Sequence, residues 1–193
     1  MRCHPSQSVA KRGFDLALAL TLMIPAIVIC AIAMTIIWFD DRANPIFTQR
    51  RLGRDGQVFH LVKLRTMRVG TGDLPSHEAR AASITRMGAL LRRTKLDELP
   101  QLVNVIRGEM SFVGPRPGLP SQTILAEARH RYGVDRLLPG ITGMAQVQGI
   151  DMSTPERLAE VDAAYLVKWS LRRDICILMH TALGGGRGDA VRQ

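Results

Sequence analysis

The stretch that decides the fold is Phe14–Phe39, FDLALALTLMIPAIVICAIAMTIIWF, which carries no charged residue after Asp15. About 20 apolar residues suffice to cross a bilayer as a helix, so this run is long enough to span one. The apolar run is too long for a cleaved signal peptide, and no small-residue cleavage site follows it. We therefore predict that residues 1–41 form a membrane-associated segment.

Basic residues flank this segment on both sides, as cytoplasmic flanks of membrane helices do. They are Arg2, Lys11 and Arg12 before it, and Arg42, Arg50, Arg51 and Arg54 after it. Pro25 lies near the middle of the run, where proline removes a helix hydrogen bond and favours a kink or break. A re-entrant helix that breaks near Pro25 and leaves on the same side fits these facts, and a kinked spanning helix is the alternative.

Charge and cysteine usage limit the classes of function. The chain has 193 residues, a formal net charge of +9 and a pI near 10.5, which favours anionic partners such as phosphates, lipid headgroups or nucleic acid. Its length suits one ordinary domain. The three cysteines show no CxxC spacing, so neither a zinc site nor a disulfide framework is indicated.

Residues 42–183 read as a small α+β domain that is predominantly helical. Pro45–Arg68 contains the turn signal Arg54-Asp55-Gly56 between two alternating runs and predicts a β-hairpin. Ser83–Arg93 predicts a basic amphipathic helix, which either lies in the headgroup plane or packs on the core. The remaining predictions are a mobile loop at residues 70–77, helices at 121–132 and 153–168, and a disordered tail at 184–193.

The stretch Thr94–Gln101, TKLDELPQ, predicts a helix start. Because proline is tolerated in a first turn, the helix should begin near Glu98 or Leu99 and end near Gly108. Asp97 and Glu98 then lie at its amino end, where backbone N–H groups and the helix dipole favour negative charge. The alternative is that Asp97 is an N-cap and Glu98 a first-turn acid without chemical function.

Basic side chains surround this acid pair in the sequence: Lys63, Arg65, Arg68, Arg92, Arg93 and Arg116. Arg116 stands between two prolines, which restrict its backbone and suit it to forked contacts with phosphate oxygens. Together with the acid pair, these cations indicate a pocket for a polyphosphate and its metal.

Several long motifs occur in a characteristic order: KRGFD, IFTQRRLGRDGQVFHLVKLRTM, RRTKLDELPQLVNVIRGEMSFVGPRPG, LPGITGMAQVQG and AAYLVKWSLRRDICILMHT. In these motifs the chain resembles the bacterial sugar transferase family, the small monotopic phosphoglycosyl transferases, over roughly residues 9 to 183. The resemblance implies transfer of a phospho-sugar from a nucleotide-diphosphate sugar, usually a UDP-sugar, to membrane polyprenyl phosphate.

The resemblance also implies roles for individual residues. Asp97 would attack the sugar-bearing phosphorus to give an aspartyl phospho-sugar intermediate, and Glu98 would help to hold Mg²⁺. Four cations would bind substrate phosphate: Lys63, Arg65, Arg92 and Arg116.

The same resemblance implies a monotopic protein on the cytoplasmic face of the bacterial inner membrane, with a re-entrant segment. Family members often carry serine before the central proline, where this chain has Ile24. Lys11 and Arg12 would meet the lipid phosphate or act as interfacial anchors. Asp174 is a weaker site candidate, with a structural salt bridge as its alternative. A homodimer is compatible with this picture.

Two other classes of function are weighed against it. A membrane-tethered nucleic-acid binder should interleave basic residues with aromatics, yet aromatics make up 5% of the chain, so no nucleic-acid partner is expected. An inactive scaffold of a glycan-assembly complex would keep the fold without the chemistry. The identity of the sugar is not determined by any residue of the sequence.

Overall fold

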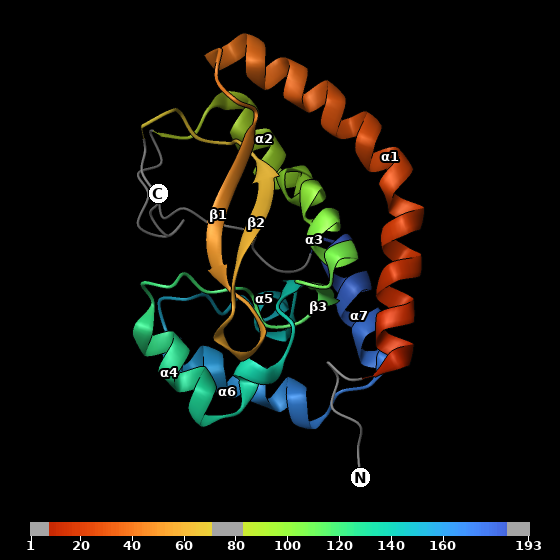
Figure 1. Ribbon diagram of the computed structural model, residues 1–193, viewed down its shortest axis with the longest axis vertical. Coiled ribbons are helices and arrows are strands. Elements are labelled where there is room, and N and C mark those ends of the chain that lie inside the picture. The colour runs from red at the N-terminus through yellow and green to blue at the C-terminus, as the bar shows by residue number, and fades with distance from the viewer. Residues whose placement is uncertain (1–7, 71–82, 185–193) are drawn as a thin grey trace.

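The computed structural model describes residues 8–70 and 83–184. Within them the chain is mostly helical, as predicted, with two small sheets, and α1 runs along one side of the molecule (Figure 1). The helices are α1 (Val9–Asp41), α2 (Arg86–Thr94), α3 (Leu102–Arg107), α4 (Thr123–Arg131), α5 (Met144–Val147), α6 (Pro155–Val167) and α7 (Leu171–Ala182), with 3₁₀ turns η2 (Arg54–Gly56), η4 (Leu96–Gln101) and η5 (Val134–Arg136). The strands are β1 (Ile46–Leu52), β2 (Val58–Leu64), β3 (Ser111–Val113) and β4 (Gly140–Thr142).

Helix α1 is continuous, and Pro25 lies inside it. The predicted break near Pro25 is therefore wrong: the helix bends smoothly instead (Figure 1). The physical reason is support on both sides of the proline, because Ala19 and Ala26 pack in the main core while Ala33 and Ile37 pack in a second cluster. Helix α1 is long enough and apolar enough to cross a membrane, and little of its apolar stretch is buried against the domain.

One face of α1 lies against the domain and the opposite face is open. The buried residues repeat at helical spacing: Lys11, Asp15, Ala19, Ala26, Ala33 and Ile37. Large apolar side chains cover the open face, including Leu20, Ile24, Ile27, Val28, Ile32 and Phe39. Small alanines let the helix approach the domain closely along most of its length, so α1 is part of the folded unit.

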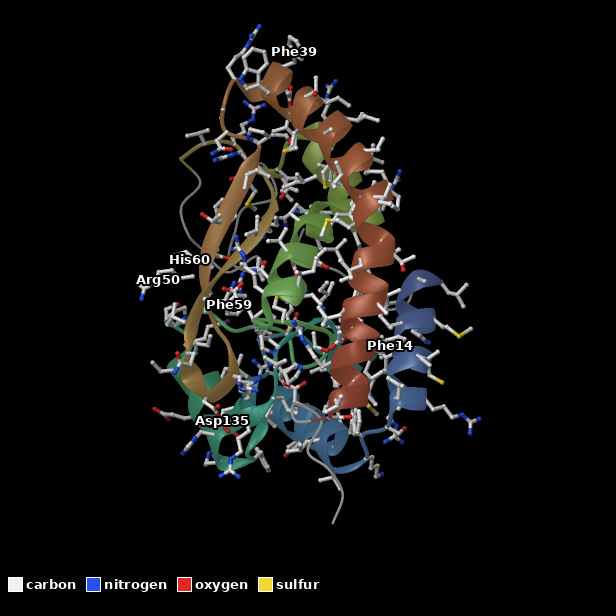
Figure 2. The ribbon with its side chains drawn as sticks, turned by 45° about the vertical axis from the view of Figure 1, so that its right-hand side comes forward. Phe14, Phe39, Arg50, Phe59, His60 and Asp135 are labelled. Atoms are coloured by element: carbon white, nitrogen blue, oxygen red, sulfur yellow. The ribbon has the colours of Figure 1, made fainter. Side chains whose placement is uncertain are left out.

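The predicted hairpin is confirmed. Strands β1 and β2 pair antiparallel from Ile46↔Leu64 to Leu52↔Val58, and the turn between them is the predicted Arg54–Gly56. Alternation along the strands sends one set of side chains inward: Gln49, Arg51, Phe59, Leu61 and Lys63. Arg50 and His60 belong to the opposite, exposed face and point away from α1 (Figure 2).

The second sheet was not predicted. Strand β3 pairs with β4 in parallel, with Ser111 opposite Gly140 and Val113 opposite Thr142. A Cβ on Gly140 would collide with the backbone of Gly114, so glycine is needed for this close approach. The pairing fixes the loop that follows β3, which carries Arg116.

The predicted helices appear with shifted ends. The regions 121–132 and 153–168 contain α4 and α6, and the region 83–93 contains all of α2 except its last residue, Thr94. Leu91 of α2 is buried against Ala33, Ile37 and Leu64, so this helix packs on the core, which was one of its two predicted alternatives. The predicted loop at 70–77 and the tail at 184–193 lie outside the described residues, apart from Gly70 and Gly184.

Candidate active site

The acid pair lies at the start of a helical segment that begins earlier than predicted. Lys95, in the left-handed region at φ 58°, ends α2 and precedes η4, which leads directly into α3. Asp97 is therefore inside the first turn and is not the N-cap, whereas the end at Gly108 is as predicted. Asp97 is buried, with 3% of its surface exposed, and Glu98 is half-buried.

Arg116 contacts Glu98, the second acid of the pair, directly. Its Nη2 donates to Glu98 Oε1 at 3.1 Å, and both side chains are largely shielded from water. The loop that carries Arg116 is held on two sides: Gly140 N–H donates to the Pro115 carbonyl, and Leu52 N–H donates to the Gly118 carbonyl, each at 2.9 Å. A preset arginine beside a carboxylate is an arrangement suited to phosphate and metal.

A small cavity joins residues from four parts of the chain. Its charged and polar lining consists of Arg51 from β1, Lys63 from β2, Glu98 and Gln101 from η4, and Arg116. Lys63 and Arg116 were predicted as phosphate-binding residues, and the structure brings both of them to Glu98. The cavity has a volume of about 10 Å³, room for about one water molecule. The excess of cations over carboxylates in its lining favours negative charge there.

Two cations of this region were missed by sequence reasoning. Arg51 donates from Nε and Nη2 to Gln49 Oε1 and from Nη1 to the Pro117 carbonyl, so it also supports the Arg116 loop. The alternation of strand β1, in which Gln49 and Arg51 share the inward face, was the signal that could have identified Arg51. Lys95 lies two residues before Asp97. Burial lowers the pKa of its ammonium group; the charge of Glu98 opposes this shift, and that of Arg116 adds to it.

Two predicted phosphate-binding residues make other contacts. Arg65 donates from Nε to the Asn44 carbonyl at 2.6 Å, and Arg92 donates from Nε to Thr66 Oγ1 at 2.8 Å. Neither lines the small cavity. Their phosphate-binding role stays a prediction.

Lys11 points into the domain. Its Nζ donates to Asp174 Oδ2 at 2.7 Å and to the Val113 carbonyl at 3.0 Å. The same Asp174 carboxylate accepts from Tyr165 Oη at 2.8 Å and from Trp169 Nε1 at 3.1 Å. Asp174 therefore forms the structural salt bridge that was its alternative, and burial together with Asp174 raises the pKa of Tyr165, which keeps that hydroxyl a donor.

Arg12 also contacts the domain. Its two terminal nitrogens donate to the carbonyls of Val105 and Ile106, at 2.7 and 2.9 Å, and so satisfy carbonyls at the end of α3. These contacts give Lys11 and Arg12 a packing role and lend no support to the predicted contact with lipid phosphate.

The donor set fits a magnesium ion that takes most of its ligands from substrate. Among the described residues no three His, Cys, Asp or Glu side chains gather to hold a metal. Mg²⁺ commonly uses one or two carboxylates together with phosphate oxygens and water, and the adjacent acids Asp97 and Glu98 can supply that number. The contact with Arg116 engages Oε1 of Glu98.

Comparison with known proteins places this geometry in a family. Residues 6–185 match the model of the family described as bacterial sugar transferase. The exopolysaccharide production protein ExoY of Sinorhizobium fredii is 34% identical, over 92% of this chain and 86% of that protein. The UDP-glucose:undecaprenyl-phosphate glucose-1-phosphate transferase of Caulobacter vibrioides is 36% identical, over 89% of this chain and 67% of that protein.

Other relatives are longer. The enzyme of the same name from Escherichia coli is 35% identical over 91% of this chain, and the chain spans 40% of its length. The match nevertheless covers the segments that carry Asp97, Glu98 and Arg116. The protein therefore belongs to the bacterial sugar transferase family and is a phosphoglycosyl transferase.

Proposed function

We propose that the protein transfers a phospho-sugar from a nucleotide-diphosphate sugar, most simply a UDP-sugar, to polyprenyl phosphate and releases the nucleoside monophosphate. The observation that carries this proposal is the convergence of Glu98, Arg116 and Lys63 on one cavity. Asp97, which precedes Glu98 in the chain, is buried and is not among the residues that line this cavity. The names of relatives, which pair UDP-glucose with undecaprenyl phosphate, support the choice of both substrates.

The reaction follows from the roles of the two acids. A carboxylate oxygen of Asp97 attacks the phosphorus that bears the sugar, and the bond from that phosphorus to the bridging oxygen breaks as the nucleoside monophosphate leaves. An oxygen of the lipid phosphate then attacks the same phosphorus and displaces Asp97, giving a polyprenyl diphosphate sugar. When held by Glu98, Mg²⁺ would neutralise charge on the diphosphate.

The cations serve both half-reactions, because both substrates present phosphate. Arg116 and Lys63 bind phosphate oxygens, and Arg116 also orients Glu98. Arg51 and Lys95 add positive charge at the edge of this site. Arg51 does so while holding the loop of Arg116, which keeps the arginine in place between the two steps.

We propose further that α1 does not cross the bilayer. Its contacts with the domain extend from Lys11 to Ile37, a length of about 39 Å at the rise of an α-helix. That exceeds the hydrocarbon thickness of about 30 Å, so a spanning α1 would carry the polar domain into the membrane. The alternative is a helix whose open apolar face enters the cytoplasmic leaflet from one side, with the basic flanks outside it.

The test uses purified protein with Mg²⁺, a panel of nucleotide sugars and polyprenyl phosphate, and measures nucleoside monophosphate release. Without lipid acceptor, we expect release equivalent to the enzyme present and a mass increase of one phospho-sugar on the chain. Asp97→Asn should lose both signals while keeping its thermal unfolding, whereas Asp55→Asn, at the exposed hairpin turn, should keep both.

Full turnover by the Asp97→Asn variant would overturn the nucleophile assignment. Absence of release with every sugar of the panel would instead favour the inactive scaffold. The sugar that gives the fastest release identifies the natural donor, for which the sequence provides no signal.

A further inference from the structure

A buried ion pair lies behind the loop that carries Arg116. Arg129 of α4 donates from Nε and Nη2 to Asp162 Oδ2 of α6, at 3.1 and 2.8 Å. Its third nitrogen, Nη1, donates to the main-chain carbonyl of Arg116 at 2.8 Å. Arg129 is 9% exposed and Asp162 is 2% exposed, so the three-residue contact is sheltered from water.

This contact acts at a point that the other supports of the loop do not reach. Main-chain bonds hold the carbonyls of Pro115 and Gly118, and Arg51 holds that of Pro117. Arg129 holds the carbonyl of Arg116 itself. Because rotation of that peptide would swing the arginine side chain away from Glu98, its hydrogen bond bears directly on the site.

Stability alone gives a weak reason for such a pair. Burial raises the pKa of Asp162, while Arg129 opposes that shift, which reflects the cost of placing a carboxylate away from water. A buried ion pair commonly returns little net stability compared with apolar packing. A planar guanidinium fixed by two bonds to one partner does offer a third donor in a defined direction.

We propose that Arg129, held by Asp162, is a positioning residue of the transferase reaction. It fixes the main chain of Arg116 so that the Arg116 guanidinium meets Glu98 and the phosphates of the nucleotide sugar. This inference rests on the proposed function, because its effect is expressed through binding of the nucleotide sugar.

The chain offers a matched control on the same two helices. Arg131 of α4 forms an ion pair with Glu156 of α6, but the two side chains are 61% and 53% exposed. Arg131 therefore also links α4 to α6, but its ion pair is exposed to solvent. The hydrogen bond to the Arg116 carbonyl comes from Arg129. Arg129→Lys and Arg131→Lys each keep the charge and lose the fork.

The first experiment compares these two variants with the wild-type protein in nucleoside monophosphate release. We expect Arg129→Lys to raise the KM for the nucleotide sugar and to lower kcat/KM roughly ten- to hundredfold, the effect of losing one hydrogen bond to a charged group. Arg131→Lys should match the wild type. If Arg129 only stabilised the fold, Arg129→Lys would lower the folded fraction, and hence the apparent kcat, while the KM for the nucleotide sugar stayed unchanged. That result would overturn the proposal.

A double-mutant cycle tests whether Arg129 acts through Arg116. In an Arg116→Ala background, Arg129→Lys should have little further effect on the dissociation constant for the nucleotide sugar, measured by titration without turnover. If the effects of the two substitutions on this dissociation constant multiply as independent effects do, the coupling between Arg129 and Arg116 is refuted. An inactive wild-type enzyme would contradict the proposed function. An active wild-type enzyme whose KM and kcat/KM are unchanged by Arg129→Lys would contradict this inference alone.

Access to Arg129 allows chemical rescue as well. A cavity of about 460 Å³, lined in part by Arg129, Gly118 and Leu119, adjoins Arg129 and is open to solvent. Methylguanidinium can enter it, so we expect added methylguanidinium to restore kcat/KM to Arg129→Ala but not to Arg129→Ala/Arg116→Ala. Equal rescue of both variants would contradict a role through Arg116, and if Arg129→Ala does not fold, the lysine variant decides.

Discussion

The substitution Lys11→Met separates the two roles considered for Lys11. It removes the charge and keeps a flexible apolar side chain of similar reach. The variant leaves the Asp174 carboxylate, which is fully buried, without its cation, although Tyr165 and Trp169 still donate to it. If the role of Lys11 is structural, Lys11→Met lowers the stability of the protein. If Lys11 binds lipid phosphate, Lys11→Met weakens recognition of the polyprenyl phosphate acceptor.

The expected loss follows from this burial. Removing one partner of a buried ion pair costs about 3–5 kcal/mol, because the other charge is left without compensation. For a chain of this length, about 2–4 °C are lost per kcal/mol, so the melting temperature should fall by about 6–20 °C. Lys11→Met/Asp174→Asn should regain part of the loss, since no buried charge is then left alone.

Thermal unfolding in detergent, followed by tryptophan fluorescence at one scan rate, measures this effect, and Trp169 reports locally because it donates to Asp174. Lys168→Met is the matched control, because that lysine is exposed. An unchanged melting temperature together with a raised KM for polyprenyl phosphate would refute our reasoning and restore the lipid-phosphate role of Lys11.

Three further predictions concern packing, charge and topology. Gly88→Ala should lower the melting temperature by several degrees, as seen in thermal unfolding, because its Cβ would overlap the Thr66 carbonyl; a wild-type melting curve would contradict this close approach of α2 to the backbone that follows β2. The amine of Lys95 should titrate below 10.5 in a ¹³C-methylation NMR experiment, and titration at or above 10.5 would refute this. Because the folded state then binds fewer protons than the unfolded state, the contribution of Lys95 to stability should rise with pH through the folded pKa and level off above 10.5. Cysteines placed at Val9 and Arg42, the two ends of α1, should both resist a membrane-impermeant thiol reagent applied from outside intact cells, and labelling at one end alone would establish a spanning helix.

The sequence predicted local features best where a short signal decides the structure. The hairpin follows from the turn at Arg54–Gly56 and the alternation around it, and the end of α3 follows from Gly108, whose positive φ suits glycine. Strands β3 and β4 have three residues each and pair across a long separation, so no local periodicity marks them.

Long-range contacts explain the remaining differences. Pro25 favours a break locally, but packing of α1 on the domain on both sides of it keeps the helix continuous. Lys11 reads as an interfacial cation until the fold brings Asp174 to it. The fold brings Lys63, Glu98 and Arg116, three members of the predicted pocket, to one cavity, whereas finding Arg51 required knowledge of which strand face points inward.

The contact between Lys11 and Asp174 joins residues 163 positions apart, and this separation has a consequence for the order in which the chain is made. Helix α1 leaves the ribosome long before α7, so during synthesis its buried face has no domain to cover it while its apolar face already favours the bilayer. We expect α1 to reach the membrane first and the catalytic domain to finish folding there, with α7, which is synthesised much later, supplying the carboxylate that fixes α1.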